Sequence, residues 1–258
     1  MNNRSLPQLR IALLLGAAAT LATLALLPYL LAVQPDLFEK LPVAIPVAVV
    51  IAAQTLQNGV LCFLLAWAGL KLGEPLGLGA PWLAAWLYKD RAKPATSSWM
   101  LAALLGVLGG ALVLGAIALF GQPIAASASP PHEAAAWQGA LASFYGGIVE
   151  ETQIRLFLMT LLGWLLLRAR LRQSLALGIA IVAAALLFGA GHLPLAAKLG
   201  PLDTLTIVRV IGYNALLAVL FGWLYWKRGI EHAMLSHFSA DLVLHVIAPL
   251  AHSFGMPA

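Results

Sequence analysis

The chain has 258 residues, of which 62% are hydrophobic and only 10% are charged. A typical soluble domain has about 25% charged residues, so this composition excludes that class and indicates an integral membrane protein. The net charge of +5 does not indicate nucleic-acid binding, because the basic residues lie between apolar segments, as topology signals do. The single cysteine, Cys62, excludes an internal disulfide and a cysteine-rich zinc site.

The first apolar segment begins at Ile11 and follows Arg4 and Arg10, an order that is also found in signal peptides. The apolar run continues to about Val33, well beyond the roughly 7–15 residues of a signal-peptide core. We therefore expect a retained first membrane helix. We also expect residues 1–258 to form a single integral membrane domain, with the catalytic core at about 137–250.

Seven apolar segments approach or exceed the roughly 20 residues that cross a bilayer. They cover about residues 11–33, 43–70, 98–120, 137–167, 174–192, 206–226 and 230–252. Strand alternation and internal repeats are absent from the sequence. The pattern predicts an all-α, polytopic transmembrane helical bundle of about seven to eight spans, with the short amphipathic piece Pro81–Tyr88 at the membrane interface.

Basic residues in the loops predict the orientation of the bundle. One set of loops holds Arg4, Arg10, Lys71, Lys89, Arg91, Lys93, Arg168, Arg170, Arg172, Lys227 and Arg228. The opposite set holds only Lys40 and Lys198. Because cytoplasmic loops are enriched in Lys and Arg, we expect a cytoplasmic N-terminus and an external C-terminus, in a bacterial plasma membrane.

The fourth apolar segment contains two adjacent acids, Glu150 and Glu151, followed by Arg155. Carboxylates are costly in hydrocarbon, so a pair of them marks a functional site by default. Glu151 and Arg155 stand four residues apart, acid first, which favours an ion pair. Neighbouring residues of an α-helix point about 100° apart, so we expect Glu150 to face elsewhere and to act as a general base.

Two later segments add histidines and a third acid. His192 precedes Leu193-Pro194, and Pro194 predicts that the fifth span ends near that histidine. His237 and Asp241 stand four residues apart on one helix face. Each feature also has a purely structural interpretation, as a buried ion pair, an interfacial histidine or a polar contact between helices. The combination indicates a hydrolytic centre.

The three motifs resemble those of the CPBP superfamily, the intramembrane CAAX-processing and bacteriocin-processing proteases. They are Glu-Glu-x-x-x-Arg at 150–155, Phe-x-x-x-His at 188–192 and His-x-x-x-Asp at 237–241, in the order of that superfamily. Two details differ from its usual pattern. Ile154 and Leu156 flank the arginine where an aromatic residue and a glycine are common, and Asp241 replaces the asparagine of prenyl-protein proteases.

The resemblance implies that Glu150 and His192 activate a water, that His237 and Asp241 stabilise the oxyanion, and that Glu151 and Arg155 support the site. It also implies a membrane-associated peptide or protein substrate, which is lipid-modified in the prenyl-protein proteases. We expect no cofactor. Zn²⁺ is the alternative, with Glu150, His192 and His237 as ligands, although the His-Glu-x-x-His helix of zincins is absent from the sequence.

Another polar group lies on the second segment, where Gln54, Gln57 and Asn58 share one helix face. Such side chains either join membrane helices or line a cavity. The whole pattern also leaves open a non-catalytic protein, either a bacteriocin-immunity scaffold or a transporter. Proton-coupled transport also uses buried Glu and His, but it usually comes with repeat symmetry.

Overall fold

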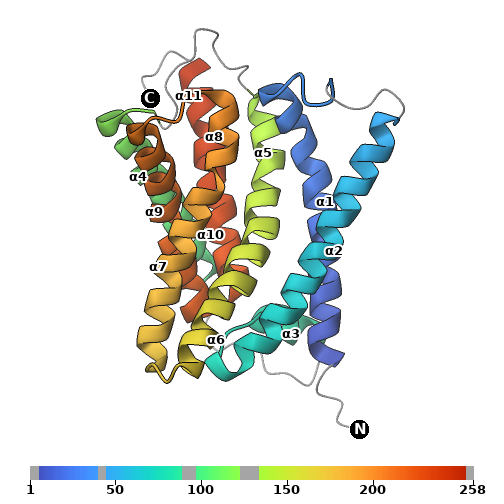
Figure 1. Cartoon of the computed structure of the whole chain (residues 1–258), viewed down its shortest axis with the longest axis vertical. Coiled ribbons are helices and arrows are strands. Elements are labelled where there is room, and N and C mark those ends of the chain that lie inside the picture. The colour runs from blue at the N-terminus through green and yellow to red at the C-terminus, as the bar shows by residue number, and fades with distance from the viewer. Residues whose placement is uncertain (1–5, 40–44, 89–96, 123–133, 254–258) are drawn as a thin grey trace.

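In the computed structural model the protein is a bundle of long helices that lie side by side (Figure 1). The structure describes residues 6–39, 45–88, 97–122 and 134–253, and these contain no β-strand. The prediction of an all-α fold is therefore confirmed. Five of the basic residues used to predict the orientation lie outside the described residues: Arg4, Lys40, Lys89, Arg91 and Lys93.

The bounds of the elements are as follows. The α-helices are α1 (Leu6–Val33), α2 (Val47–Gly73), α3 (Pro81–Leu87), α4 (Trp99–Phe120), α5 (Ala136–Phe144), α6 (Thr160–Arg168), α7 (Gln173–Gly191), α8 (Leu193–Leu199), α9 (Thr204–Arg228), α10 (Ile230–Leu242) and α11 (Ala248–Ser253). The 3₁₀ turn η2 (Glu74–Leu76) follows α2. The π-helical segments are η3 (Tyr145–Glu150), η4 (Thr152–Met159) and η5 (Val243–Ile247).

Within the described residues, six helical stretches are long and apolar enough to cross a membrane. They are Gln8–Val33, Val47–Leu76, Trp99–Phe120, Gln173–Leu199, Thr204–Arg228 and Ile230–Ala251. Leucines such as Leu21, Leu56 and Leu119 are exposed along them, as expected for side chains that face lipid. The chain is thus an integral membrane protein, and six of the seven predicted segments correspond to these stretches.

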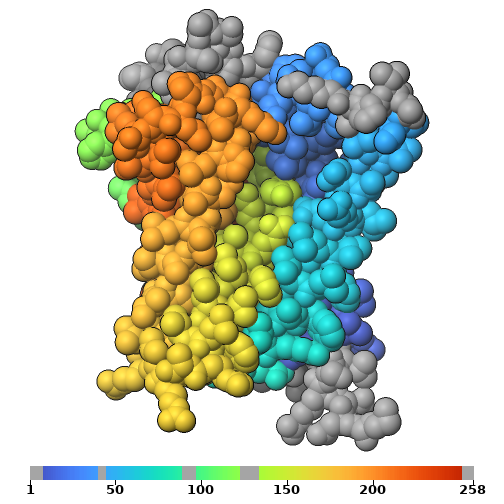
Figure 2. Space-filling model, in the orientation of Figure 1, coloured from blue at the N-terminus to red at the C-terminus, as the bar shows by residue number. Residues whose placement is uncertain are grey.

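The remaining predicted segment, 137–167, is broken by π-helical turns. It forms α5, η3, η4 and α6 in succession, and these elements follow one path through the bundle (Figure 1). In the space-filling view the same path fills the face between α7 and α2 (Figure 2). The predicted segment is therefore helical throughout, but it is not one regular α-helix. π-Helical turns often occur at functional sites, and these two lie directly before and after Glu151.

As predicted, the helix of the fifth segment ends next to His192: α7 ends at Gly191, and His192 is its C-cap. His192 lies at the junction of α7 and α8, and the helical path continues to Leu199. Pro194 falls in the first turn of α8, where its missing N–H would have had no helical partner in any case. The last predicted span, 230–252, is likewise interrupted by η5.

Small residues let the helices approach closely, as is common in membrane proteins. A side chain at Gly106 of α4 would meet the backbone of Ser236 in α10. A side chain at Gly69 of α2 would meet the backbone of Leu156 in η4. These contacts hold α10 and η4, which carry the predicted site residues, firmly against their neighbours.

The turn between α9 and α10 is recessed inside the protein. Gly229 has a φ of 95°, which favours glycine, and Ile230 is fully buried. The Ile230 amide donates to the Gly79 carbonyl at 3.1 Å. α10 therefore begins beneath the chain segment that leads into α3.

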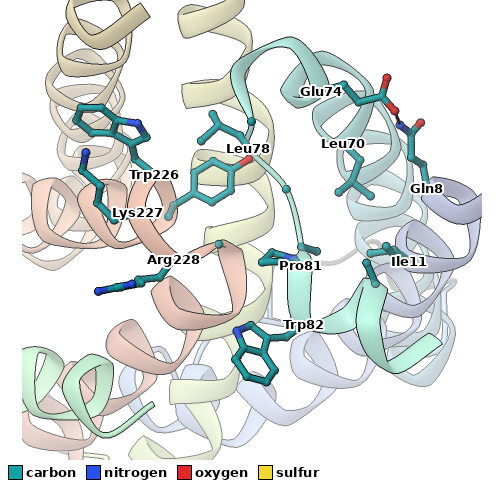
Figure 3. Close-up of a pocket in the computed structure, with 16 residues that line it drawn as sticks. Gln8, Ile11, Leu70, Glu74, Leu78, Pro81, Trp82, Trp226, Lys227 and Arg228 are labelled. Atoms are coloured by element: carbon teal, nitrogen blue, oxygen red, sulfur yellow. Dashed lines mark hydrogen bonds between the residues drawn. The ribbon is translucent and has the colours of Figure 1, made fainter. Parts of the chain in front are cut away.

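α3 closes over this turn and is fastened to it by Glu231. One carboxylate oxygen of Glu231 accepts hydrogen bonds from the amides of Trp82 and Leu83, each at 2.8 Å. A cavity of about 410 Å³ lies beside the turn, with Trp82 and Pro81 on one side and Arg228 on the other (Figure 3). No residue of the three motifs lines this cavity.

Candidate active site

Glu151 is the fully buried centre of a charged group. Its Oε1 atom lies 2.9 Å from Nη1 of Arg155, so the ion pair expected from the sequence is present. The same oxygen accepts a hydrogen bond from Nδ1 of His237 at 2.7 Å. The Glu151 side chain has 0% exposure, so it can reach no substrate. It fixes the imidazole of His237 and its tautomer, because a carboxylate only accepts.

The other ring nitrogen of His237 points between two more acids. Its Nε2 atom lies 3.6 Å from Oε2 of Glu150 and 3.6 Å from Oδ1 of Asp241. These distances are too long for hydrogen bonds but short enough for strong electrostatic interaction. The Glu150 side chain is 23% exposed, and therefore it can be reached from the adjoining cavity. The two adjacent glutamates thus lie beside different nitrogens of the His237 ring, Glu150 beside Nε2 and Glu151 beside Nδ1.

Gly146 makes this arrangement possible. A side chain at this position would collide with Oδ2 of Asp241 and with Nε2 of His237. Gly147 likewise faces the backbone of Met234 and the side chain of Phe238. The two glycines of η3 therefore bring the helix that carries Glu150 directly against α10.

His192 comes from the α7–α8 junction. Its Nδ1 atom lies 2.9 Å from the carbonyl oxygen of Phe188. A carbonyl only accepts, so Nδ1 carries the hydrogen and Nε2 is left to accept one. A neutral histidine with this tautomer can orient a water molecule or take a proton from it.

Aromatic rings cover the charged group. Phe221 stacks on His237, with ring centroids 4.5 Å apart and an interplanar angle of 19°. The ring of Phe188 lies 4.7 Å from that of His192 and 6.0 Å from that of His237. The guanidinium of Arg155 lies over Phe188 at 4.8 Å and over Phe221 at 5.3 Å. Cation–π contacts of this kind support a buried arginine without admitting water.

A cavity of about 540 Å³ joins the motif residues. Glu150, His192, His237 and Asp241 all line it, whereas Glu151 and Arg155 lie behind its wall. Residues at the ends of α4, α8 and α11 also line it, and these ends lie at the end of the bundle opposite the N-terminus (Figure 1). The four candidate catalytic residues thus share one cavity.

Among the described side chains, no group of three or more His, Cys, Asp or Glu residues has an arrangement that would hold a metal ion. His237 uses Nδ1 for Glu151, which leaves Nε2 as its one possible ligand atom. Zn²⁺ with Glu150, His192 and His237 as ligands stays a prediction.

Several lining residues were not selected from the sequence. Tyr145, Tyr29 and Phe221 contribute to the cavity. Tyr145 stands five residues before Glu150, and a π-helical turn brings such residues onto one face. In a regular α-helix, with about 3.6 residues per turn, Tyr145 and Glu150 would lie on different faces. Asn214 of α9 also lines the cavity.

Comparison with known protein families gives a match that covers this site. Residues 132–243 match the model of a family described as Type II CAAX prenyl endopeptidase Rce1-like. This part of the chain is similar to that family. No curated protein and no solved structure matches the chain.

The match to the Rce1-like family confirms the resemblance to the CPBP superfamily of intramembrane proteases. It runs from just before α5 to the first residue of η5, and so it includes all three motifs. α1, α2 and α4 lie outside it. The match spans the three motifs, whereas part of the cavity lining comes from α1 and α4, which lie outside it.

Proposed function

We propose that the protein is an intramembrane endopeptidase that hydrolyses a peptide bond in a membrane-associated protein or peptide, and that its preferred substrate is lipid-modified. One observation carries the proposal: Glu150, His192, His237 and Asp241 line a single cavity within a membrane bundle. The family match supports the same class of activity.

In the proposed reaction, Glu150 takes a proton from a water that attacks the scissile carbonyl carbon. His192 orients that water through Nε2, the nitrogen that its contact with Phe188 leaves available. Glu150 then gives the proton to the departing amine nitrogen, which completes the cleavage. General acid–base catalysis of this kind contributes about 10²–10⁴-fold to a rate.

The oxyanion is proposed to form beside His237. With Nδ1 held by Glu151, a protonated imidazole presents its Nε2–H to the cavity and can donate to the oxyanion. A protonated Asp241, whose carboxyl lies 3.6 Å from that nitrogen, would supply a second donor. Glu151 and Arg155 act as positioning residues, because both are buried behind His237.

We further propose that the N-terminus is cytoplasmic and that the membrane is a bacterial plasma membrane. Arg10, Lys71, Arg168, Arg170, Arg172, Lys227 and Arg228 belong to the N-terminal end of the bundle, where α1 begins and where α2, α6 and α9 end. By the positive-inside rule this end faces the cytoplasm. The active-site cavity would then open at the opposite side.

The test is cleavage of quenched fluorescent peptides by the protein in lipid nanodiscs. Peptides that end in a farnesylated CAAX sequence are compared with the same peptides without the lipid, for the wild type and Glu150→Gln, with and without a zinc chelator. Cleavage that needs Glu150 and resists the chelator supports the proposed mechanism. Loss of cleavage in chelator, restored by added zinc, would contradict the metal-free mechanism. Equal cleavage by both proteins would contradict the role of Glu150 as the base, and cleavage by neither would favour a non-catalytic scaffold or transporter.

A further inference from the structure

A second cleft adjoins the active-site cavity. It has a volume of about 480 Å³ and lies between α1 and α2, where these helices diverge at the end away from the N-terminus (Figure 1). Tyr145 and Leu26 line both this cleft and the active-site cavity. Tyr145 stands at the start of η3, and Glu150 is the last residue of that segment. The cleft is therefore a neighbour of the cavity that holds the proposed catalytic base, and the two share Leu26 and Tyr145 as lining residues.

The polar face of α2 lines this cleft. Asn58 has partners on both sides: it donates to Thr23 at 2.6 Å, and it accepts from Gln153 at 3.2 Å. It thus joins α1 and η4 to α2, as interhelical polar residues do. Of the two roles expected from the sequence, Asn58 therefore joins helices. Gln54 and Gln57 do not.

Gln54 and Gln57 line the same cleft and are exposed. Within the part of the chain that the structure describes, neither carboxamide has a hydrogen-bond partner. The helical rise of 1.5 Å per residue places them about 10–15 Å from the first residue of α2. At that depth an unpaired polar group is costly, because lipid offers no hydrogen bonds. A polar ligand bound in the cleft would supply hydrogen-bond partners for both carboxamides.

An extended peptide has the chemistry that fits. A substrate must be unwound to present its scissile carbonyl, and its free N–H and C=O groups then need partners at membrane depth. Each carboxamide offers both a donor and an acceptor. Groups three or four residues apart on a helix are about 5–6 Å apart, close to the roughly 6.6 Å two-residue repeat of an extended chain. A lipid chain could use neither the donors nor the acceptors.

We propose that the cleft between α1 and α2 binds the extended main chain of the substrate through Gln54 and Gln57, and guides it past Tyr145 to Glu150. This inference rests on the proposed peptidase function. It adds a binding site on helices that lie outside the family match at residues 132–243.

The kinetic test uses the double variant Gln54→Leu/Gln57→Leu. We expect KM for a cleaved peptide to rise about tenfold and kcat to change little, because each neutral hydrogen bond contributes about threefold to tenfold in affinity. The thermal midpoint should not fall, because these side chains have no described partner to lose. The matched control is Leu56→Ala, on the same helix, exposed, and outside the cleft. It should leave KM unchanged.

A binding test removes any dependence on turnover. In the Glu150→Gln background, Gln57→Cys supplies a reactive thiol, since the native Cys62 is buried. A farnesylated peptide and its plain counterpart should each slow maleimide labelling of this thiol, whereas farnesylcysteine methyl ester alone should not. Leu56→Cys is the control and should be labelled at the same rate with and without peptide.

The two tests separate the inference from the proposed function. Cleavage that needs Glu150, with an unchanged KM in the double variant and no protection at position 57, would overturn the inference and leave the peptidase intact. Protection by the lipid probe alone would also overturn it, since the cleft would then bind a lipid chain. Protection by peptide without any cleavage would uphold the binding site and count against the peptidase.

Discussion

His237 and Glu151 are joined by a hydrogen bond of 2.7 Å across 86 residues of sequence. The same glutamate oxygen meets Arg155 at 2.9 Å, so one buried carboxylate both orients the imidazole and neutralises the arginine. This relationship gives the second glutamate of the motif a different task from the first. Glu150 faces the cavity, whereas Glu151 holds the group that faces it.

The buried ion pair predicts a particular pattern of stability. Glu151→Leu should lower the free energy of unfolding by about 3–5 kcal/mol, because it leaves the charge of Arg155 buried and unpaired. The double variant Glu151→Leu/Arg155→Leu should recover much of that loss, since an apolar pair can replace a buried ion pair at little cost. Neither variant should be active, because His237 loses its partner. Thermal unfolding in detergent and peptide cleavage check this, and an active double variant would contradict the positioning role.

Gly146 should not tolerate a side chain. Gly146→Ala brings a methyl group into Asp241 and His237, so we expect a stability loss of about 1–3 kcal/mol from overpacking and a loss of cleavage. The matched control is Gly115→Ala in α4, where an added methyl group meets nothing within 4 Å. That change should be neutral or stabilising by up to about 1 kcal/mol. Wild-type cleavage by Gly146→Ala would show that the close contact is not needed.

His192 is expected to act on turnover rather than on folding. His192→Ala should reduce kcat by at least about 100-fold, as loss of a proton-transfer residue does. Its side chain is only partly buried and makes one described hydrogen bond, to Phe188, so the thermal midpoint should change little. Steady-state kinetics and differential scanning fluorimetry measure both quantities. A kcat within twofold of the wild type would remove His192 from the mechanism.

Glu231 should set the depth of α10. Glu231→Ala removes both hydrogen bonds to the amides of Trp82 and Leu83, and bonds to a carboxylate contribute about 1.5–3 kcal/mol each. We expect a lower thermal midpoint together with faster proteolysis at the α3 segment. Glu74→Ala serves as the control, since the exposed carboxylate of Glu74 bonds only to Gln8 within the described residues. Equal effects of the two changes would mean that the link to α3 is not structural.

Much of the site could be predicted because its chemistry is local. Two adjacent acids in an apolar segment, an arginine four residues on and a His-x-x-x-Asp pair are all visible in the sequence. The ion pair of Glu151 with Arg155 follows from helical spacing alone. The hydrogen bond from His237 to Glu151 does not, because it depends on how two distant helices are placed against each other.

The depths of the residues could not be predicted for the same reason. A regular fourth helix and an α10 that starts at the membrane surface would leave Glu150 and His237 at different levels. In the structure, η3 and η4 interrupt the helix of the fourth apolar segment. The α9–α10 turn is recessed beneath Pro81 and Trp82. Gly146 and Gly229 accompany these features and pack closely against residues remote in sequence, and periodicity carries no information about such contacts.

The most direct test of the central claim is the ratio of kcat/KM between the wild type and Glu150→Gln on the same cleaved peptide in nanodiscs. The exchange keeps the size of the side chain and removes the base, and the partly exposed position should leave the thermal midpoint unchanged. We predict a loss of at least about 100-fold. A Glu150→Gln protein that is folded and cleaves the peptide at the wild-type rate would show that Glu150 is not the base of this reaction.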